Sequence, residues 1–383
     1  MTEHVVVRGC SAKLLLVAVL AMATVCGCST APKQEMAAVT SVFYPPLPNA
    51  PRIQHLRTFT GEGDVAKQTS DFARFIVGDA QSGVQLQQPY GVAMYDGKLY
   101  VADSKGPGLM VFDLKQNRFS LITGTGNGRM KRPINVTIDR DGTKYVTDTG
   151  RDQILVFDEK DRFVTAFGAE GEFKPVDTAI AGDRLYVADI RHHQIQVLDK
   201  RTGQLLFKFG KAGSKEGELF HPTNLALGPD GDIYVVETSN FRVQRFTPEG
   251  KFVRIYGEVG TAPGRFTRPK GIAIDRAGRL YVGDSAFENV QIFDPSGKLL
   301  LYFGQPGDRA EGLNLPAGVA IDYDNVDLFK RYADPRFALE YVIFVASQFG
   351  PNKVDVFGFG RMRGMSYSPD ESQIANTATN IPR

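Results

Sequence analysis

Short runs of alternating apolar and polar positions follow one another along this chain, and one arrangement of runs returns six times. Each copy opens with a proline, continues as an apolar run, passes through a turn, and ends a second apolar run in an acidic residue, or in Ser347 in the last copy. The opening residues are Pro89, Pro133, Pro175, Pro222, Pro269 and Pro316, which are 44, 42, 47, 47 and 47 residues apart. A nearly fixed period in this range, with several strands in each repeat, is typical of β-propeller blades.

The first five copies also contain two further strands, and the last copy contains one. Nine residues after the acidic position, an apolar residue ends a third strand, and in the last copy Phe357 comes one residue late. A fourth strand then ends in an aromatic or apolar residue before a glycine, as in Phe167-Gly168 and Phe303-Gly304. Four alternating strands per repeat predict an all-β fold, a six-bladed β-propeller of four-stranded antiparallel blades, because both faces of a blade pack on neighbouring sheets.

The last copy lacks a fourth strand, and a matching segment lies at the other end of the repeat region. Residues 53–61, which read Ile-Gln-His-Leu-Arg-Thr-Phe-Thr-Gly, show the alternation of a fourth strand and its closing glycine. We expect this N-terminal strand to pair with the third strand of blade six and to close the ring. Closure removes the exposed sheet edges that favour aggregation.

Two segments interrupt the repeat, and the ends lie outside it. Residues 62–88 contain a predicted short helix at residues 71–76, and residues 324–340 form an insertion between the first two strands of blade six. The interpretation divides the chain into a signal peptide (1–27), a lipidated cysteine with a proline-rich spacer (28–51), the propeller (52–358) and a disordered C-terminal tail (359–383).

The first residues resemble a bacterial lipoprotein signal. Arg8 and Lys13 precede an apolar run over residues 14–25 that is short for a membrane span, and the sequence Val-Cys-Gly-Cys follows at residues 25–28. The resemblance implies lipidation at Cys28, whereas the alternative is an ordinary cleaved signal peptide. Because Ser29 is not aspartate, lipoprotein sorting rules favour the outer membrane, on its periplasmic side or at the cell surface.

Charge and cysteine content limit the kinds of partner and site. The chain has 45 basic and 43 acidic residues, so its overall field does not attract polyanions, and we expect no nucleic acid partner. All three cysteines, Cys10, Cys26 and Cys28, lie in the signal segment. The exported domain is therefore predicted to contain no disulfide and no thiolate metal site.

The repeats resemble the NHL repeat. Residues 185–199, which read LYVADIRHHQIQVLD, match its consensus, including a histidine before the third strand, here His193. Phe220-His221-Pro222 and residues 266–275 match its opening. The resemblance covers about residues 52–358 and implies a propeller, but not one activity, because the same ring serves protein binders, RNA binders, lyases and lactonase-like enzymes.

The repeated acidic residues are interpreted as structural. A residue present in nearly every blade is expected to hold the same turn in each, by accepting backbone N–H bonds between the second and third strands. The members are Asp103, Asp148, Asp189, Glu237 and Asp284.

A candidate metal site lies two residues after the opening prolines. That position holds Gly91, Asn135, Asp177, Asn224, Gly271 and Gly318, and a shared need for positive φ explains the set without function. The position faces the mouth of the central channel, however. The oxygens of Asn135, Asp177 and Asn224 in three successive blades are therefore a candidate site for a hard cation such as Ca²⁺.

Histidines add no catalytic arrangement. His55 falls in the closing strand, His221 in an opening turn, and His193 at the consensus position, while His192 departs from the repeat. Beside them, the sequence shows no nucleophile motif, phosphate loop or cysteine pair.

Two function classes follow. The first is a monomeric, non-enzymatic scaffold, anchored to the outer membrane, that binds an envelope or secreted protein partner. The second is a metal-dependent envelope lyase or lactonase-like hydrolase that uses the channel mouth. RNA binding would need a basic face, which no dense run of Lys and Arg indicates.

Overall fold

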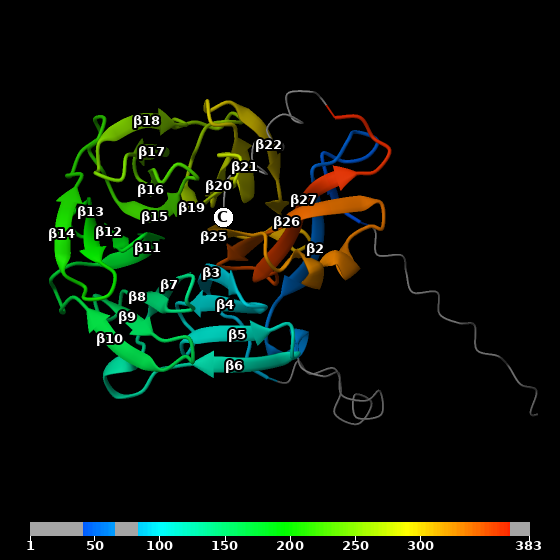
Figure 1. Ribbon diagram of the computed structural model, residues 1–383. Helices are drawn as coiled ribbons and strands as arrows, with labels where there is room; N and C mark the ends of the chain where they lie inside the picture. Colours follow the sequence, from blue (N-terminus) through cyan, green and yellow to red (C-terminus); the bar gives the residue numbers. More distant parts are fainter. Residues whose placement is uncertain (1–40, 66–82, 368–383) are drawn as a thin grey trace, which may run out of the picture. The chain divides into compact units, whose positions relative to one another are not determined.

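The fold is a ring of six antiparallel sheets around a central channel (Figure 1). The computed structural model describes residues 41–65 and 83–367. Blades one to five each have four strands in sequence order from the channel outwards. The expected all-β, six-bladed fold is confirmed.

The strands of the six blades have the following bounds. Blade one contains β3 (Pro89–Tyr95), β4 (Lys98–Asp103), β5 (Leu109–Asp113) and β6 (Arg118–Ile122); blade two contains β7 (Pro133–Ile138), β8 (Lys144–Asp148), β9 (Gln153–Phe157) and β10 (Phe163–Phe167). Blade three contains β11 (Pro175–Ala181), β12 (Arg184–Asp189), β13 (Gln194–Asp199) and β14 (Leu205–Phe209); blade four contains β15 (Pro222–Leu227), β16 (Ile233–Glu237), β17 (Arg242–Phe246) and β18 (Phe252–Tyr256). Blade five contains β19 (Pro269–Ile274), β20 (Leu280–Asp284), β21 (Asn289–Phe293) and β22 (Leu299–Phe303); blade six contains β25 (Pro316–Asp322), β26 (Phe337–Ser347), β27 (Val354–Met362) and β2 (Ile53–Phe59).

The N-terminal strand closes the ring as expected. Strand β2 pairs antiparallel with β27, with Phe59 opposite Val354 and Ile53 opposite Phe359. In Figure 1 the blue β2 lies beside the orange-red β27, although the two strands are about 300 residues apart in sequence. A further short strand, β1 (Phe43–Tyr44), pairs with the outer side of β2.

Both ends of the ordered domain extend beyond the predicted bounds. Strand β1 lies inside the segment interpreted as spacer, and β27 continues to Met362 rather than ending near residue 358. The physical reason is the long partner strand β26, whose first residues pair with the end of β27 and lengthen this sheet. Tyr367 then donates a hydrogen bond to the carbonyl of Pro51 at 2.8 Å, which fixes the start of the predicted tail.

Six apolar cores lie between the blades, one at each interface. The core between blades two and three, for example, contains Ile154 and Val156 from one sheet and Val187 and Leu198 from the next. The core between blades six and one contains Phe344 and Val101 among others, so the ring is continuous through its closing blade. The middle strands of the sheets, such as β4 and β8, are therefore buried on both faces, as the alternating pattern predicted, whereas outer strands such as β6 and β14 are largely exposed.

The interruptions have different structural outcomes. The insertion between β25 and β26 forms two 3-10 turns, η3 (Val326–Leu328) and η4 (Lys330–Tyr332), between which Phe329 is buried and packs edge-on against Phe344. The insertion therefore belongs partly to the core. The predicted helix at 71–76, the signal segment, Cys28 and residues 368–383 lie outside the described residues. No helix within the described ranges is long and apolar enough to cross a bilayer.

Candidate functional site: the joining face and the channel mouth

One face of the ring is made of the loops that join consecutive blades, and we call it the joining face. It also carries the turns between second and third strands, because each opening proline pairs with the residue that ends the second strand, as Pro175 does with Asp189 and Pro316 with Ser347. The inner strands begin at this face, so the channel mouth predicted from the sequence lies here.

The repeated acidic residues hold the joining face together. Asp103 accepts the backbone N–H groups of Gln87 and Gln88 in the joining loop and of Lys105 and Gly106 in the turn. Asp148 and Asp284 make the same kinds of contact, and all five acids of the set are fully buried. The structural interpretation is therefore confirmed, with an added role in fixing the preceding joining loop.

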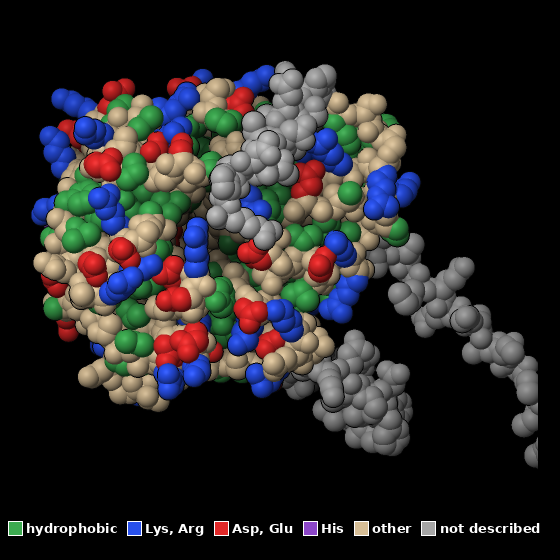
Figure 2. Space-filling view, in the orientation of Figure 1, with side chains coloured by type: hydrophobic (Ala, Val, Ile, Leu, Met, Phe, Trp, Pro, Cys, Tyr) green, Lys and Arg blue, Asp and Glu red, His purple; other side chains and the backbone are tan. Residues whose placement is uncertain are grey.

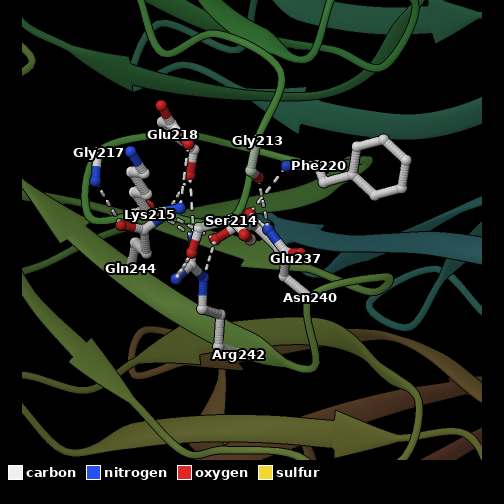
Figure 3. Close-up of polar contacts among 10 residues, drawn as sticks. All are labelled: Gly213, Ser214, Lys215, Gly217, Glu218, Phe220, Glu237, Asn240, Arg242 and Gln244. Atoms are coloured by element: carbon white, nitrogen blue, oxygen red, sulfur yellow. Dashed lines mark hydrogen bonds and ion pairs between the residues drawn. The ribbon is translucent and has the colours of Figure 1, made fainter.

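In blade four a larger network fixes one joining loop (Figure 3). Glu237 accepts from Arg242 Nε at 2.7 Å and from the backbone N–H of Phe220 at 2.8 Å. Arg242 also donates to the carbonyls of Ser214, Lys215 and Glu218. Three backbone carbonyls and one carboxylate thus hold a single buried guanidinium, so the loop before blade four is rigid.

That loop presents an aromatic cluster at the surface. The Phe220 side chain is 38% exposed. Its ring stacks on His193 with centroids 4.7 Å apart and contacts the tilted ring of His221 at 4.4 Å. His193 Nδ1 accepts the backbone N–H of His221 at 3.0 Å. Other large apolar side chains exposed in loops of this face are Val259, before blade five, and Phe349, in a turn of blade six.

The histidines have structural partners, as the sequence indicated for three of them. His55 pairs with Asp355 across the β2–β27 contact at 3.1 Å, and His221 contacts Ser239 Oγ at 2.8 Å. His192 contacts the buried Asp189 at 2.7 Å and keeps an exposed ring. His192 and His193 therefore contact different partners rather than a common ligand.

A tyrosine crosses the mouth of the channel. Tyr90 is the second residue of β3 in blade one, and its hydroxyl lies 3.4 Å from the side-chain amide of Asn224 in blade four, on the opposite side of the ring. The backbone carbonyl of Tyr90 lies against Gly318 of blade six, where a Cβ would collide with it. The mouth is therefore partly closed by side chains from the inner strands.

The structure brings the predicted Asn135, Asp177 and Asn224 together beneath Tyr90. Asn135 Nδ2 donates to Asp177 Oδ1 at 2.6 Å, and the backbone N–H groups of Thr178 and Leu225 donate to the same carboxylate at 2.7 and 2.8 Å. The Asn224 amide lies 3.4 Å from Asp177 Oδ2. Burial raises the pKa of the Asp177 carboxyl to about 7, although these N–H donors oppose the shift.

N–H donors already occupy much of the oxygen capacity that a Ca²⁺ ion would need. Asp177 Oδ1 accepts from Asn135 Nδ2 and Thr178 N–H, Asp177 Oδ2 accepts from Leu225 N–H, and Asn135 Oδ1 accepts from the backbone N–H of Val136 at 2.9 Å. Within residues 41–65 and 83–367, no group of three or more His, Cys, Asp or Glu is placed to hold a metal. The Ca²⁺ site stays a prediction, which calorimetric titration of the protein with Ca²⁺ tests.

The prediction that the positions two residues after the opening prolines need a positive φ was wrong. None of the six residues two after the prolines has a positive φ. Close approach between inner strands explains the glycines instead, since a Cβ at Gly91 would lie 2.6 Å from the Cα of Asn135. A register shift follows the opening proline in all six blades.

A cavity of about 870 Å³ occupies the channel at the opposite end, and it continues into a chamber of about 120 Å³ that ends at Asp177. Both are lined by Thr137, Thr178, Leu225 and Ile272. Figure 2 shows a hollow at the middle of the ring with acidic and basic side chains beside it. The channel thus narrows from a wide cavity, whose lining includes the charged residues Asp139, Asp183 and Lys200, to the small chamber that ends at Asp177.

Sequence reasoning missed two residues at the mouth, Tyr90 and Lys270. Each follows an opening proline, where the other repeats have mostly apolar residues such as Ile134 and Val176. That departure from the repeat is a signal present in the sequence. Lys270 Nζ lies 5.5 Å from the centre of the Tyr90 ring, so the two side chains meet.

Comparisons with known proteins agree with the architecture. The family model described as NHL repeat matches residues 221–246, which contain the first three strands of blade four. Protein brain tumor of Drosophila melanogaster is 37% identical over 89 residues, which are 22% of this chain and 8% of that protein. The matched parts cover at most a fifth of the curated relatives.

Among solved structures, virginiamycin B lyase from Staphylococcus aureus has a TM-score of 0.50 at 14% identity, covering 72% of this chain and 96% of that one. A gluconolactonase from Xanthomonas campestris has a TM-score of 0.53 at 16% identity, covering 82% and 91%. At these identities the similarity concerns the fold alone. This chain is therefore a six-bladed β-propeller in which the first three strands of one blade match the NHL repeat.

Proposed function

We propose that this propeller is a rigid scaffold that binds a protein partner through its joining face. The observation that carries the proposal is the exposed aromatic cluster of Phe220 with His193 and His221. Aromatic side chains are enriched where proteins bind one another, since they bury much apolar area and lose little conformational freedom. Val259, 61% exposed, and Phe349, 48% exposed, extend the apolar surface of this face over further blades.

The rigidity of the cluster supports this role. Phe220 is held at its backbone by the buried Glu237, which in turn is held by Arg242. A side chain that is already ordered before binding loses less entropy when a partner covers it. The network of Figure 3 therefore prepares Phe220 for contact with a partner.

A photo-crosslinking amino acid in place of Phe220, in cells that produce the full chain, tests the proposal. We expect an adduct of one reproducible mass, which mass spectrometry identifies as a protein. The matched control places the same amino acid at Leu300, which is 40% exposed on the outer strand of blade five. Equal labelling at both positions, or no adduct at Phe220, would contradict a joining-face partner.

The partner is proposed to be an envelope or secreted protein, because the predicted signal and lipidation at Cys28 would hold the propeller at the outer membrane. The change Cys28→Ser should move the protein from the membrane fraction to the soluble exported fraction, because a lipid chain supplies the membrane affinity. Fractionation and mass spectrometry of the mature N-terminus measure this. A Cys28→Ser protein that stays in the outer membrane fraction would refute the anchor.

The alternative, a lyase or lactonase-like hydrolase at the channel, is favoured by one observation. Asp177 lies at the end of the channel chamber and has a pKa raised to about 7, and perturbed carboxyls are common at catalytic sites. If an activity exists, Asp177→Ala should abolish it and leave crosslinking from position 220 intact. Under the scaffold proposal, the same substitution changes neither.

A further inference from the structure

Lys270 is a buried cation at the centre of the joining face. It is the second residue of β19, and its side chain is 8% exposed. Its Nζ donates to Gln348 Oε1 at 2.9 Å and lies over the Tyr90 ring. Blades five, six and one therefore meet around this ammonium group.

Within the described ranges, Lys270 makes no ion pair with a carboxylate. The charge near it is that of Arg268, exposed at the end of the joining loop, and this like charge adds to the effect of burial. Burial and then Arg268 lower the pKa of Lys270 to about 8. A buried charge is normally paired, because desolvation is costly without a partner.

The other groups around Lys270 do not supply the missing negative charge. Tyr90 is neutral, since burial raises the pKa of its hydroxyl far above the working range. Asp177 is held by N–H donors of blades two, three and four. Gln348 accepts with its oxygen and keeps its amide N–H₂ group as a further donor.

We propose that Lys270, Gln348 and Arg268 form a binding site for a carboxylate group at the mouth of the channel. The ammonium and the Gln348 amide offer donors side by side to the two oxygens of one planar monoanion, and the Arg268 guanidinium adds a charge at the exposed side. A carboxylate carries one negative charge, which is the counter-charge that the Lys270 ammonium lacks. The group belongs either to a small organic acid or to the C-terminus of a peptide. The site stands independently of the proposed protein partner.

Titration of the full-length protein with acetate tests the site, with neutral acetamide as the matched probe of similar shape. Nuclear magnetic resonance of the Lys270 side chain measures the binding and the pKa. We expect acetate, and not acetamide, to shift the Lys270 signals and to raise the pKa of Lys270 by about one unit. Unchanged Lys270 signals, or equal shifts with both probes, would overturn the proposal.

Two variants test whether acetate binding depends on the Lys270 charge rather than on the stability of the fold. Lys270→Met keeps the apolar stem, removes the unpaired charge and should weaken acetate binding at least tenfold without lowering the Tm. Lys251→Met, at an exposed turn of blade four, should leave acetate binding within twofold of wild type. If Lys270→Met binds acetate with the wild-type affinity, Lys270 is not part of the binding site. The acetate-dependent pKa of Lys270 in the unmodified protein tests the site without any variant.

Further probes identify which kind of molecule carries the carboxylate. They also distinguish the carboxylate site from the proposed protein-binding surface at Phe220. A short peptide with a free C-terminus that binds more tightly than its amidated form indicates a peptide ligand, whereas equal binding of acetate and such a peptide indicates a small acid. Phosphate that binds more tightly than acetate would overturn the choice of carboxylate. Phe220→Ala should keep acetate binding, so loss of the protein partner and loss of this site are distinguishable.

Discussion

At the residue scale, buried carboxylates have two roles in this protein. Some hold turns and joining loops, and one lies at the channel mouth, and the N–H groups that donate to each carboxylate distinguish the two roles. Asp103 and Asp148 accept several backbone N–H groups at the joining face and repeat from blade to blade. Asp177 occurs once, lies beside the channel and joins three blades through Asn135 and Leu225. The repeated acids were correctly predicted as structural, because repetition is visible in the sequence, whereas the partners of Asp177 come from different blades.

The raised pKa of Asp177 predicts a pH dependence of stability. Its pKa is about 7 in the fold and near the ordinary aspartate value of 3.8 in the unfolded chain, so the folded protein binds the extra proton between these values. The free energy of unfolding is therefore unaffected by this group below about pH 4 and falls as the pH rises to 7. The substitution Asp177→Asn removes the titrating carboxyl group, although it also replaces one hydrogen-bond-accepting oxygen by an NH₂ group.

We expect the unfolding free energy of Asp177→Asn, relative to wild type, to rise by about 2–3 kcal/mol between pH 5 and pH 8. Urea denaturation at several pH values measures it. Asp183→Asn, at a side chain that is 70% exposed, is the control and should show no such trend. Parallel curves for Asp177→Asn and wild type would show that Asp177 has an ordinary pKa.

At the element scale, the closing strand β2 acts as the fourth strand of blade six. Its alternation at 53–61 was enough to predict the pairing, because successive side chains of a fourth strand point to opposite faces of the blade whichever end of the chain supplies the strand. The short strand β1 was not predicted, since two residues carry no recognisable alternation. The length of β27 was also missed, because it depends on the extended partner β26.

The substitution Phe59→Ala tests closure. Phe59 is fully buried at the end of β2, with its ring 5.2 Å from that of Phe112 in blade one, so its loss should cost about 3–5 kcal/mol. Phe303→Ala, at the same position of an ordinary blade and equally buried, should cost a similar amount. Thermal and urea unfolding compare the two with the exposed control Leu300→Ala, and a Phe59→Ala protein as stable as that control would contradict closure by β2.

At the scale of the whole molecule, six interface cores form one closed circle. Every blade packs against two others, so the ring has no terminal blade from which unfolding can begin. Open repeat arrays, in contrast, gain stability from nearest neighbours and can unfold from their ends. Closure therefore predicts cooperative unfolding of the propeller.

We expect Val187→Ala, between blades two and three, and Phe344→Ala, between blades six and one, to lower the midpoint of one shared transition. Far-ultraviolet circular dichroism follows the strands and near-ultraviolet dichroism follows the tyrosines, since the chain has no tryptophan. Coincident curves are the expected result. Separate transitions for the two probes in either variant would show that the blades unfold independently.

The sequence by itself determined the number of blades, their four strands and the strand that closes the ring. These features are encoded in local alternation, which six copies repeat and which burial on both faces requires. Only the tertiary structure decided the chemistry of the mouth. Tyr90 meets Asn224 from 134 residues away, and Lys270 meets Gln348 from 78 residues away, because inner strands of different blades converge at the axis. Contacts across a ring join positions that no period in the sequence connects.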